Sequence, residues 1–304
     1  MNGPGPVRYL VGVTVLEVIQ RSTEFLGKKG VDSPRLQTEL LLAHLLELPR
    51  MQLYLNFERA LTASQLDSFR ELIKRRGQRE PLQQIMGSTS FCGLEITVNR
   101  HVLVPRPETE LLAEYGWQFL NRISAGNPQP ATAMDFGTGS GCLAIALAVH
   151  CPALRVSALD LSAEALQVAS QNAARHGVAE RIGFFQGDGF AALTGENPFD
   201  LIASNPPYIP TPELMALQPE VRDYEPRQAL DGGADGLDYY RRLATEAGDF
   251  LKADGRMLLE FGDGQEESLR ALFQQQNWIV EQIAEDYTHR PRILIARKGN
   301  SGKS

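Results

Sequence analysis

The tetrapeptide Asn205-Pro206-Pro207-Tyr208 directly follows a short apolar run, Phe199–Ser204. Two consecutive prolines restrict the backbone and supply no N–H, so the carbonyl groups of this stretch are free to accept hydrogen bonds. The Asn205 side chain adds an amide oxygen, and Tyr208 adds an aromatic face. This combination suits a planar NH2 group. It predicts chemistry at nitrogen, with Asn205, Pro206 and Tyr208 as catalytic residues and Pro207 as part of the same substrate-binding loop.

A glycine-rich stretch, Gly137-Thr138-Gly139-Ser140-Gly141, lies upstream of this loop. Glycines allow a sharp turn after a strand and a close approach of the backbone to a ligand. Gly137, Gly139 and Gly141 are therefore predicted to let the backbone approach a bound cofactor. By itself the pattern is compatible with NAD, FAD or S-adenosylmethionine.

Three acidic residues, Asp135, Asp160 and Asp188, lie at the ends of three successive predicted strands. Such an acidic rim would repel a dinucleotide pyrophosphate but would accept a cationic sulfonium and an ammonium group. The pattern favours S-adenosylmethionine. An alternative is that these carboxylates only cap helices, which fits one of them better than all three.

From residue 131 onward, strand patterns alternate with helical patterns, which predicts a parallel, doubly wound sheet. The last two strands follow each other without a helix, so they should form a hairpin that places one antiparallel strand in the sheet. This order is typical of an α/β fold with a seven-stranded, Rossmann-like methyltransferase sheet. The predicted strands are Ala131–Asp135, Arg155–Asp160, Ile182–Gln186, Phe199–Ser204, Met257–Phe261, Trp278–Ala284 and Arg292–Ala296.

The chain before residue 131 has a different organisation. Capping boxes begin at Thr14 and Thr62, and Ser33-Pro34 has the form of an N-cap followed by proline, so a small helical bundle is expected. Residues 88–104 predict short strands in a hairpin, and a helix should follow Pro105. Three domains are predicted: 1–86, a helical substrate-recognition domain; 87–125, a β-hairpin and linker helix; and 126–304, the catalytic domain.

Composition narrows the class of protein. The 304 residues are 43% hydrophobic and 22% charged, and neither a membrane-spanning run nor an export signal is visible, so a cytoplasmic location is expected. Three cysteines and five histidines show no metal-binding spacing, so no metal is predicted. Residues 1–95 hold 12 Lys or Arg against 10 Asp or Glu, and the rest hold 18 against 27. The acidic catalytic half argues against DNA as a substrate.

Beyond these patterns, the chain from about Val13 to Arg297 resembles the HemK/PrmC family, the glutamine N5-methyltransferases of peptide chain release factors. Besides the Asn205 loop and the glycine turn, the resemblance rests on four stretches: Phe91–Glu95, Val102–Glu110, Tyr224–Arg227 and Ala229–Leu237. It implies transfer of a methyl group from S-adenosylmethionine to the glutamine of the Gly-Gly-Gln loop in class I release factors. The resemblance also implies which residues contact the cofactor: Gly137, Thr138, Gly139, Ser140, Gly141, Asp160, Gly189 and Asn205. Arg106 and Glu108 would then lie beside the site, either positioning the linker helix or contacting the substrate loop. A monomer without DNA or membrane contacts is expected.

Three alternatives remain open. A ribosomal-protein glutamine methyltransferase would share the catalytic loop. A DNA adenine N6-methyltransferase would need a basic groove and a target-recognition region. A cofactor-binding regulator without activity would be expected to carry a degraded Asn205 loop, and the loop is intact.

Overall fold

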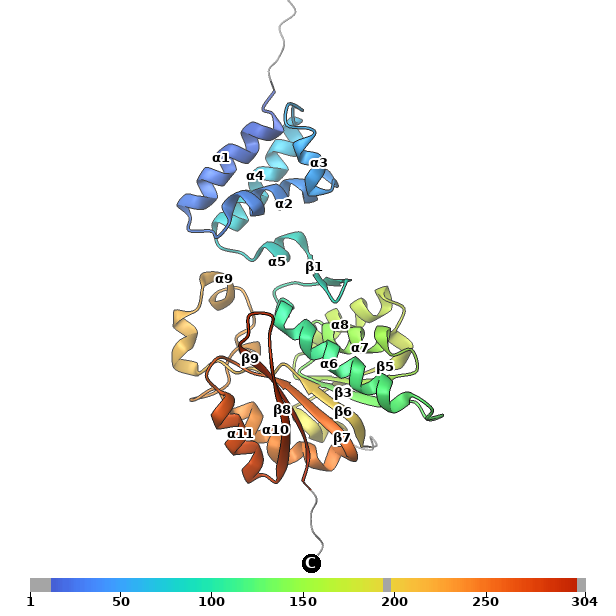
Figure 1. Ribbon diagram of the computed structural model, residues 1–304. Helices are drawn as coiled ribbons and strands as arrows, with labels where there is room; N and C mark the ends of the chain where they lie inside the picture. Colours follow the sequence, from blue (N-terminus) through green and yellow to red (C-terminus); the bar gives the residue numbers. More distant parts are fainter. Residues whose placement is uncertain (1–11, 194–197, 300–304) are drawn as a thin grey trace, which may run out of the picture. The chain divides into compact units, whose positions relative to one another are not determined.

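The computed structural model describes residues 12–193 and 198–299 (Figure 1). Residues 1–11, 194–197 and 300–304 of the predicted domains lie outside this description. By its packing the chain divides into two compact units, Met1–Met86 and Gly87–Ser304. Residues 87–125, which were predicted to be a separate linking segment, are part of the second unit.

The first unit is helical, and its helices surround a core of their own that includes Leu41, Leu42 and Phe69. Both predicted capping boxes are present, at Thr14 and Thr62. The helices are α1 (Val15–Lys28), α2 (Pro34–Leu46), α3 (Arg50–Tyr54), α4 (Ala63–Gly77) and α5 (Leu82–Met86).

The second unit begins with a two-stranded antiparallel hairpin, β1 (Ser88–Phe91) and β2 (Leu94–Thr97). The long helix α6 (Pro107–Ser124) follows and packs against the central strands β6 and β7. Its first turn carries Thr109, which is buried. This helix therefore brings the Pro105–Glu110 segment to the same edge of the sheet as the ends of those strands.

A seven-stranded sheet forms the centre of this unit, in the order β5-β4-β3-β6-β7-β9-β8. All pairs from β5 to β7 are parallel, whereas β9 runs antiparallel to both neighbours. The predicted sheet, including its C-terminal hairpin, is thus confirmed. The strands are β3 (Thr132–Phe136), β4 (Arg155–Asp160), β5 (Ile182–Gln186), β6 (Phe199–Ser204), β7 (Leu251–Glu260), β8 (Trp278–Glu285) and β9 (Pro291–Lys298).

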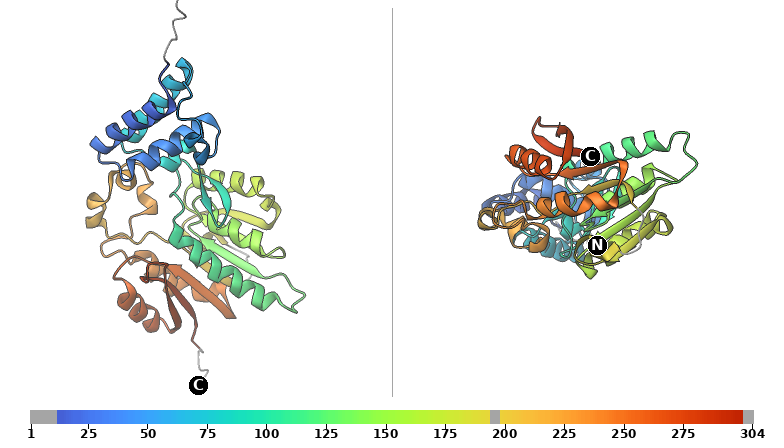
Figure 2. Two further views of the ribbon diagram at one scale, coloured as in Figure 1. Left: turned by 45° about the horizontal axis from the view of Figure 1, so that its top comes forward. Right: turned by 90° about the horizontal axis from the view of Figure 1, so that it is seen from below.

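Helices cover both faces of the sheet (Figure 2). One face and α6 share a core with α7 (Cys142–His150) and α8 (Ala163–Arg175). The other face packs on α10 (Asp238–Glu246) and α11 (Glu266–Gln275). A long excursion with the short helix α9 (Pro219–Arg222) and two 3-10 turns, Thr211–Ala216 and Arg227–Ala229, connects β6 to α10. This arrangement places all parallel strand ends at one edge.

The structure corrects three local expectations. Ser33 does not cap α2 through its side chain, because its backbone is left-handed (φ 47°) and not extended as a side-chain N-cap requires. Residues 102–104 are not a strand. Strand β7 begins at Leu251, not Met257, because the polar run between them continues as strand with its side chains largely exposed.

None of the helices among residues 12–193 and 198–299 combines the length and the apolar character needed to cross a membrane. Within the same residues, no group of three or more His, Cys, Asp or Glu side chains is placed to hold a metal ion.

Candidate active site

The glycine stretch forms the turn between β3 and α7. Gly137, Gly139 and Gly141 all have positive φ, at 74°, 54° and 80°. At Gly141 a side chain would also meet the Cβ of Ala169 at 2.9 Å. The amides of Gly137 and Thr138 both donate to the carbonyl of Leu159, each at 2.9 Å. The turn is therefore fixed against β4, and these positions require glycine for conformational reasons.

Asp135 stabilises this turn through hydrogen bonds of its side chain. Its Oδ2 accepts from the Thr138 hydroxyl at 2.6 Å and from the Ala144 amide at 3.1 Å. Complete burial raises the pKa of Asp135 to about 7, although both donors oppose the shift. The side chain thus organises the start of α7, and its predicted contact with a cofactor stays a prediction.

Asp160 ends β4 and connects to the same turn. Its Oδ2 accepts from the Gly139 amide at 2.8 Å, and its Oδ1 accepts from the Ser162 amide at 2.9 Å. Burial raises the pKa of Asp160, against the effect of these backbone donors. A carboxylate has further lone pairs, so Asp160 can accept from a ligand as well.

Asp188 and Gly189 follow β5, and both contact Arg242 of α10. Arg242 Nη1 donates to the Asp188 carboxylate, and Nη2 donates to the Asp188 carbonyl at 2.6 Å. A side chain at Gly189 would collide with this guanidinium. The Asp188 side chain is 77% exposed. Its charge is therefore balanced by Arg242, and the acidic rim is weaker here than the sequence predicted.

These elements line two cavities that share Leu103, Gly137, Gly139 and Asn205. The first cavity is also lined by Asp160, Asp188, Gly189, Pro206 and Pro207. The second cavity adds Asp135, Thr138, Ser140, Arg106 and Thr109. The structure thus brings the glycine turn, the three acidic residues and most of the Asn205 loop to one place. Asn205 lies at the junction.

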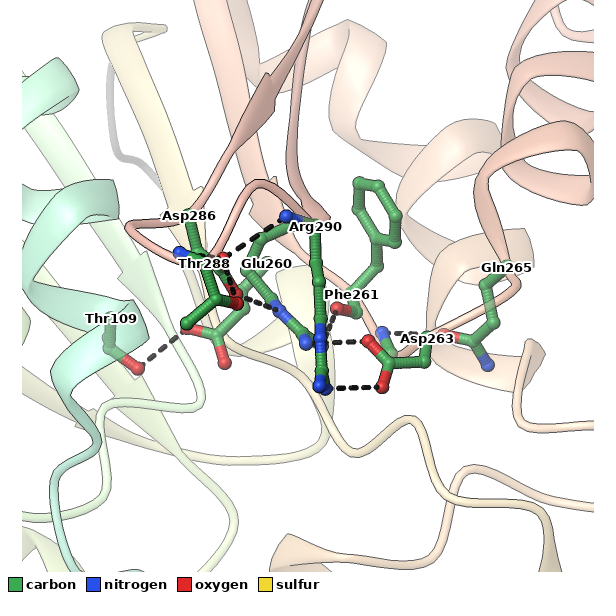
Figure 3. Close-up of polar contacts among 10 residues, drawn as sticks. Thr109, Glu260, Phe261, Asp263, Gln265, Asp286, Thr288 and Arg290 are labelled. Atoms are coloured by element: carbon green, nitrogen blue, oxygen red, sulfur yellow. Dashed lines mark hydrogen bonds and ion pairs between the residues drawn. The ribbon is translucent and has the colours of Figure 1, made fainter.

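The Asn205 loop leaves the end of β6, where the Ser204 hydroxyl donates to the carbonyl of Phe136 at 2.6 Å. The Asn205 Nδ2 donates to Thr109 Oγ1 at 3.0 Å. The Thr109 hydroxyl donates to Glu260 Oε2 at 2.6 Å (Figure 3). The Asn205 side chain is therefore held by residues from α6 and from the end of β7.

Tyr208, at the other end of the loop, rests on the segment after β7. A side chain at Gly262 would lie 2.9 Å from the Tyr208 ring, so glycine permits the close contact. Gln265 Nε2 donates to the Tyr208 carbonyl at 3.0 Å, while Gln265 Oε1 accepts from the Gly262 amide at 2.9 Å. Burial is the main cause that raises the pKa of the Tyr208 phenol. The phenol therefore stays protonated at neutral pH.

Arg292 of β9 is hydrogen-bonded to the segment that follows β7. Its Nη1 donates to the Phe261 carbonyl at 2.9 Å, and its Nη2 donates to Asp263 at 2.6 Å. Asp286, 3.6 Å from Arg292, also accepts from the Thr288 hydroxyl at 2.6 Å. These interactions lower the pKa of Asp286 to about 2, with the Thr288 hydroxyl as the largest cause.

Arg106 and Glu108 lie at the start of α6. Arg106 Nη2 donates to Glu225 Oε2 at 2.6 Å, and this ion pair joins two of the motifs in the sequence across 119 positions of the chain. Glu108 is half-buried, close enough to influence Glu260 and Tyr208 electrostatically. The ion pair with Glu225 supports a positioning role for Arg106. The predicted contacts of Arg106 and Glu108 with the substrate loop stay predictions.

Sequence reasoning did not assign roles to Glu260, Gln265, Arg242 or Arg292. Glu260 carried a usable signal, because it ends an apolar strand in the same way as Asp135 and Asp160. The other three are long polar side chains that reach the site through contacts with residues distant in sequence, namely Gln265 with Tyr208, Arg242 with Asp188 and Arg292 with Phe261, and no local pattern identifies them.

Two family models match this chain. One is described as the PrmC N-terminal domain and covers residues 17–87. The other is described as the methyltransferase small domain and covers residues 118–215. The first match falls on the helical unit, and the second runs from α6 past the Asn205 loop.

Curated relatives match nearly the full length. A protein of Geobacter sulfurreducens named release factor glutamine methyltransferase is 43% identical over 286 residues, covering 94% of this chain and 97% of the relative. A protein of the same name from Chlorobaculum tepidum is 42% identical, covering 92% and 96%. Among solved structures, the hMettl16 catalytic domain has a TM-score of 0.53 at 12% identity, covering 75% of this chain and 82% of that one. That likeness concerns the fold alone.

Proposed function

Because this chain belongs to the release factor glutamine methyltransferase family, we propose that it transfers a methyl group to the side-chain amide nitrogen (N5) of a glutamine. The donor is S-adenosylmethionine. The acceptor is the glutamine of the Gly-Gly-Gln motif in class I peptide chain release factors. The observation that carries the proposal is that Asn205, Pro206 and Pro207 line the same cavity as Gly137, Gly139 and Asp160.

The cavity suits S-adenosylmethionine. Gly137 and Gly139 have open space where a side chain would begin, so a ligand can approach their backbone closely. Asp160 and Asp188 provide carboxylate acceptors for hydroxyl and amino groups, and acidic residues favour a cationic ligand. The proposed cofactor-binding residues come from the glycine turn, the three acidic strand ends and the reactive loop: Gly137, Thr138, Gly139, Ser140, Gly141, Asp135, Asp160, Asp188, Gly189 and Asn205. When bound, the cofactor supplies an electrophilic methyl group on a positively charged sulfur that leaves as a neutral thioether.

The residues of this chain must orient the glutamine amide nitrogen and make it nucleophilic. An amide nitrogen is a weak nucleophile because its lone pair is delocalised into the carbonyl. The Asn205 side-chain oxygen and the Pro206 carbonyl can each accept one N–H of the glutamine, which orients the nitrogen lone pair and favours a more pyramidal nitrogen. Fixed alignment of two reacting groups lowers the barrier strongly. Tyr208 would support the planar amide, while Pro207, Arg106 and Glu108 shape the substrate side.

No general base is required at the nitrogen. The N–C bond forms as the C–S bond breaks, and the methylated nitrogen is briefly cationic and therefore acidic. Its extra proton can pass to water after transfer. The acceptors at Asn205 and Pro206 stabilise the N–H groups as their positive charge grows, which is when the interaction contributes most to rate.

The proposal extends to the partner and the setting. The helical unit would recognise the body of the release factor while the second unit modifies its loop. An excess of Asp and Glu over Lys and Arg after residue 95 supports a protein rather than DNA as substrate. Release factors act in cytoplasmic translation, so the proposed enzyme is cytoplasmic, and it is proposed to act as a monomer.

Mass spectrometry tests the proposal directly. The protein is incubated with S-adenosylmethionine and a purified class I release factor, and the Gly-Gly-Gln peptide is examined for one added methyl group. A release factor whose glutamine is replaced by glutamate serves as the control, because it lacks the accepting nitrogen. No methylation of the release factor, or methylation of a ribosomal protein instead, contradicts the proposal.

Asn205→Ala is the matched enzyme variant. We expect it to fold and to bind S-adenosylmethionine, but to lose at least about 100-fold in kcat, the usual cost of removing one group that stabilises a transition state. Near-normal turnover of this variant would refute the role of Asn205.

A further inference from the structure

Three side chains from three elements form a continuous hydrogen-bond chain under the Asn205 loop. Glu260 at the end of β7 and Thr109 in the first turn of α6 are 1% and 3% exposed. Thr109 Oγ1 lies 2.6 Å from Glu260 Oε2 (Figure 3). It also lies 3.0 Å from Asn205 Nδ2.

The chemistry of these groups gives the chain a direction. An ionised carboxylate can only accept, and a hydroxyl has a single proton. Thr109 must therefore donate to Glu260, which leaves only a lone pair for Asn205. Asn205 must then present its NH2 group to Thr109 and its oxygen to the opposite side. The two ends of a carboxamide have nearly the same shape, so packing alone would not select one orientation.

That orientation matters for the proposed reaction, on which this inference rests. A glutamine N–H needs an acceptor at Asn205. A rotated Asn205 would present its NH2 group, so that two donors would face each other and the glutamine would lose one of the bonds that align it. We propose that Thr109 is a positioning residue, which together with Glu260 holds Asn205 in the orientation competent for methyl transfer.

Charged and titratable neighbours decide whether Glu260 can keep this role. Arg292 on β9 and Arg106 before α6 favour its charged form, whereas Glu108 disfavours it. Tyr208 and Tyr240 are also close, and the Tyr240 hydroxyl donates to the backbone carbonyl of Glu260 at 2.7 Å. Burial outweighs the Thr109 hydrogen bond and the arginines, and it raises the pKa of Glu260 to about 7. When Glu260 is protonated, it donates to Thr109, and Thr109 then donates to Asn205. The Asn205 carboxamide must therefore rotate so that its oxygen, not its NH2 group, faces Thr109.

The test uses a pair of substitutions at one position. Thr109→Val keeps the shape of the side chain but removes the hydroxyl, whereas Thr109→Ser keeps the hydroxyl. We expect Thr109→Val to lower kcat for the release factor about tenfold, with the Kd for S-adenosylmethionine changed by less than about twofold. Thr109→Ser should remain within about threefold of wild type. A folded Thr109→Val enzyme with wild-type kcat would overturn the proposal.

A second measurement follows hydrogen exchange of the Asn205 side-chain NH2 group and needs no substrate. In ¹⁵N NMR, the Asn205 NH2 signals, assigned with Asn205→Asp, should be protected from hydrogen exchange in wild type and in Thr109→Ser, but not in Thr109→Val. If the wild-type enzyme fails to methylate release factors while this pattern is seen, the proposed function is wrong and the positioning role stands. If protection is the same in all three proteins, the positioning role is wrong whatever the substrate.

Glu260→Gln covers the case in which Thr109→Val does not fold. A carboxamide can donate as well as accept, so the direction of the chain is no longer fixed. We expect kcat to fall about threefold or more at pH 8, where wild-type Glu260 is ionised. An unchanged kcat at this pH contradicts the role of Glu260.

Discussion

Glu260 and Asp135 are two buried carboxyl groups whose pKa values are raised to about 7 by the same cause, the loss of solvation. Their partners differ. Asp135 accepts from a hydroxyl and from the Ala144 amide that begins α7, whereas Glu260 accepts from the Thr109 hydroxyl that also orients Asn205. Protonation of Asp135 therefore concerns the glycine turn, and protonation of Glu260 concerns the reactive loop.

At the scale of single residues, we predict that kcat falls as the pH is lowered through about 7. The reason is that Glu260 fixes Asn205 only as a carboxylate, which is the dominant form above its pKa. The measurement is kcat between about pH 6 and pH 8.5 at saturating substrates, for wild type and Glu260→Gln. The variant should lack the acid limb. Identical pH profiles for the two enzymes would show that Glu260 does not control the rate.

Stability has the opposite dependence on pH, which allows the two effects to be separated. The ordinary pKa values of these carboxyl groups are 3.8 for Asp135 and 4.5 for Glu260, so the folded protein binds their protons more tightly than the unfolded chain does. Stability from these groups is present at low pH and is lost as the pH rises through the window up to about 7. A loss of activity on acidification is thus not explained by unfolding caused by these two residues.

The residues that bear chemistry could be predicted from sequence to a useful degree. Asn205 and the glycines stand out because their types and spacing are unusual and local. Thr109 is different, because a threonine in the first turn of a helix is common and its role depends on Glu260, which is distant in the chain and meets it only in the fold.

At the scale of elements, the end of β7 supports the whole reactive loop. Glu260 reaches Asn205 through Thr109, and Gln265 and Gly262 contact Tyr208. Arg292 on the neighbouring antiparallel strand holds the backbone between these residues. The active site therefore depends on the pairing of β7 with β9 as well as on the parallel strands.

We predict that Arg292→Met lowers the free energy of unfolding by about 3 kcal/mol, because it leaves buried Asp286 and the Phe261 carbonyl without this partner. Arg290→Met is the matched control. Arg290 contacts the same Asp263, but its side chain is 62% exposed, against 10% for Arg292. Its removal should change stability by less than about 0.5 kcal/mol. Urea unfolding measures both, and equal effects would contradict this account.

The sheet could be predicted because each strand has an apolar core and a turn signal after it. The start of β7 could not, since Lys252 and Asp254 are polar residues on an exposed part of the strand. Strand β6 pairs with β7 at Leu251 and again from Arg256 onward, with an irregular register between them, so these polar residues belong to the strand without a burial pattern that a sequence could reveal.

At the scale of the molecule, the two units have separate hydrophobic cores, one in residues 15–86 and the others after residue 90. We predict that residues 87–304 fold alone and bind S-adenosylmethionine with a Kd within about threefold of the full chain. Their kcat/KM for a whole release factor should be at least about tenfold lower, since binding energy from remote contacts is lost.

A short Gly-Gly-Gln peptide is the control substrate for this prediction. It lacks the remote contacts, so both forms should methylate it equally well. If residues 87–304 methylate the whole release factor as efficiently as the full chain does, the helical unit has no role in recognition.

The position of β9 between β7 and β8 has a consequence for how the protein folds. Strands β8 and β9 are joined by a short connection and can form a hairpin early, whereas β9 must find β7 across a longer stretch of chain. Arg292 arrives at the Phe261 carbonyl only when the hairpin docks. An intermediate with the hairpin undocked would already contain the glycine turn, but its Glu260 segment would lack support. During refolding, the capacity to bind the cofactor should therefore return before the capacity to turn over substrate.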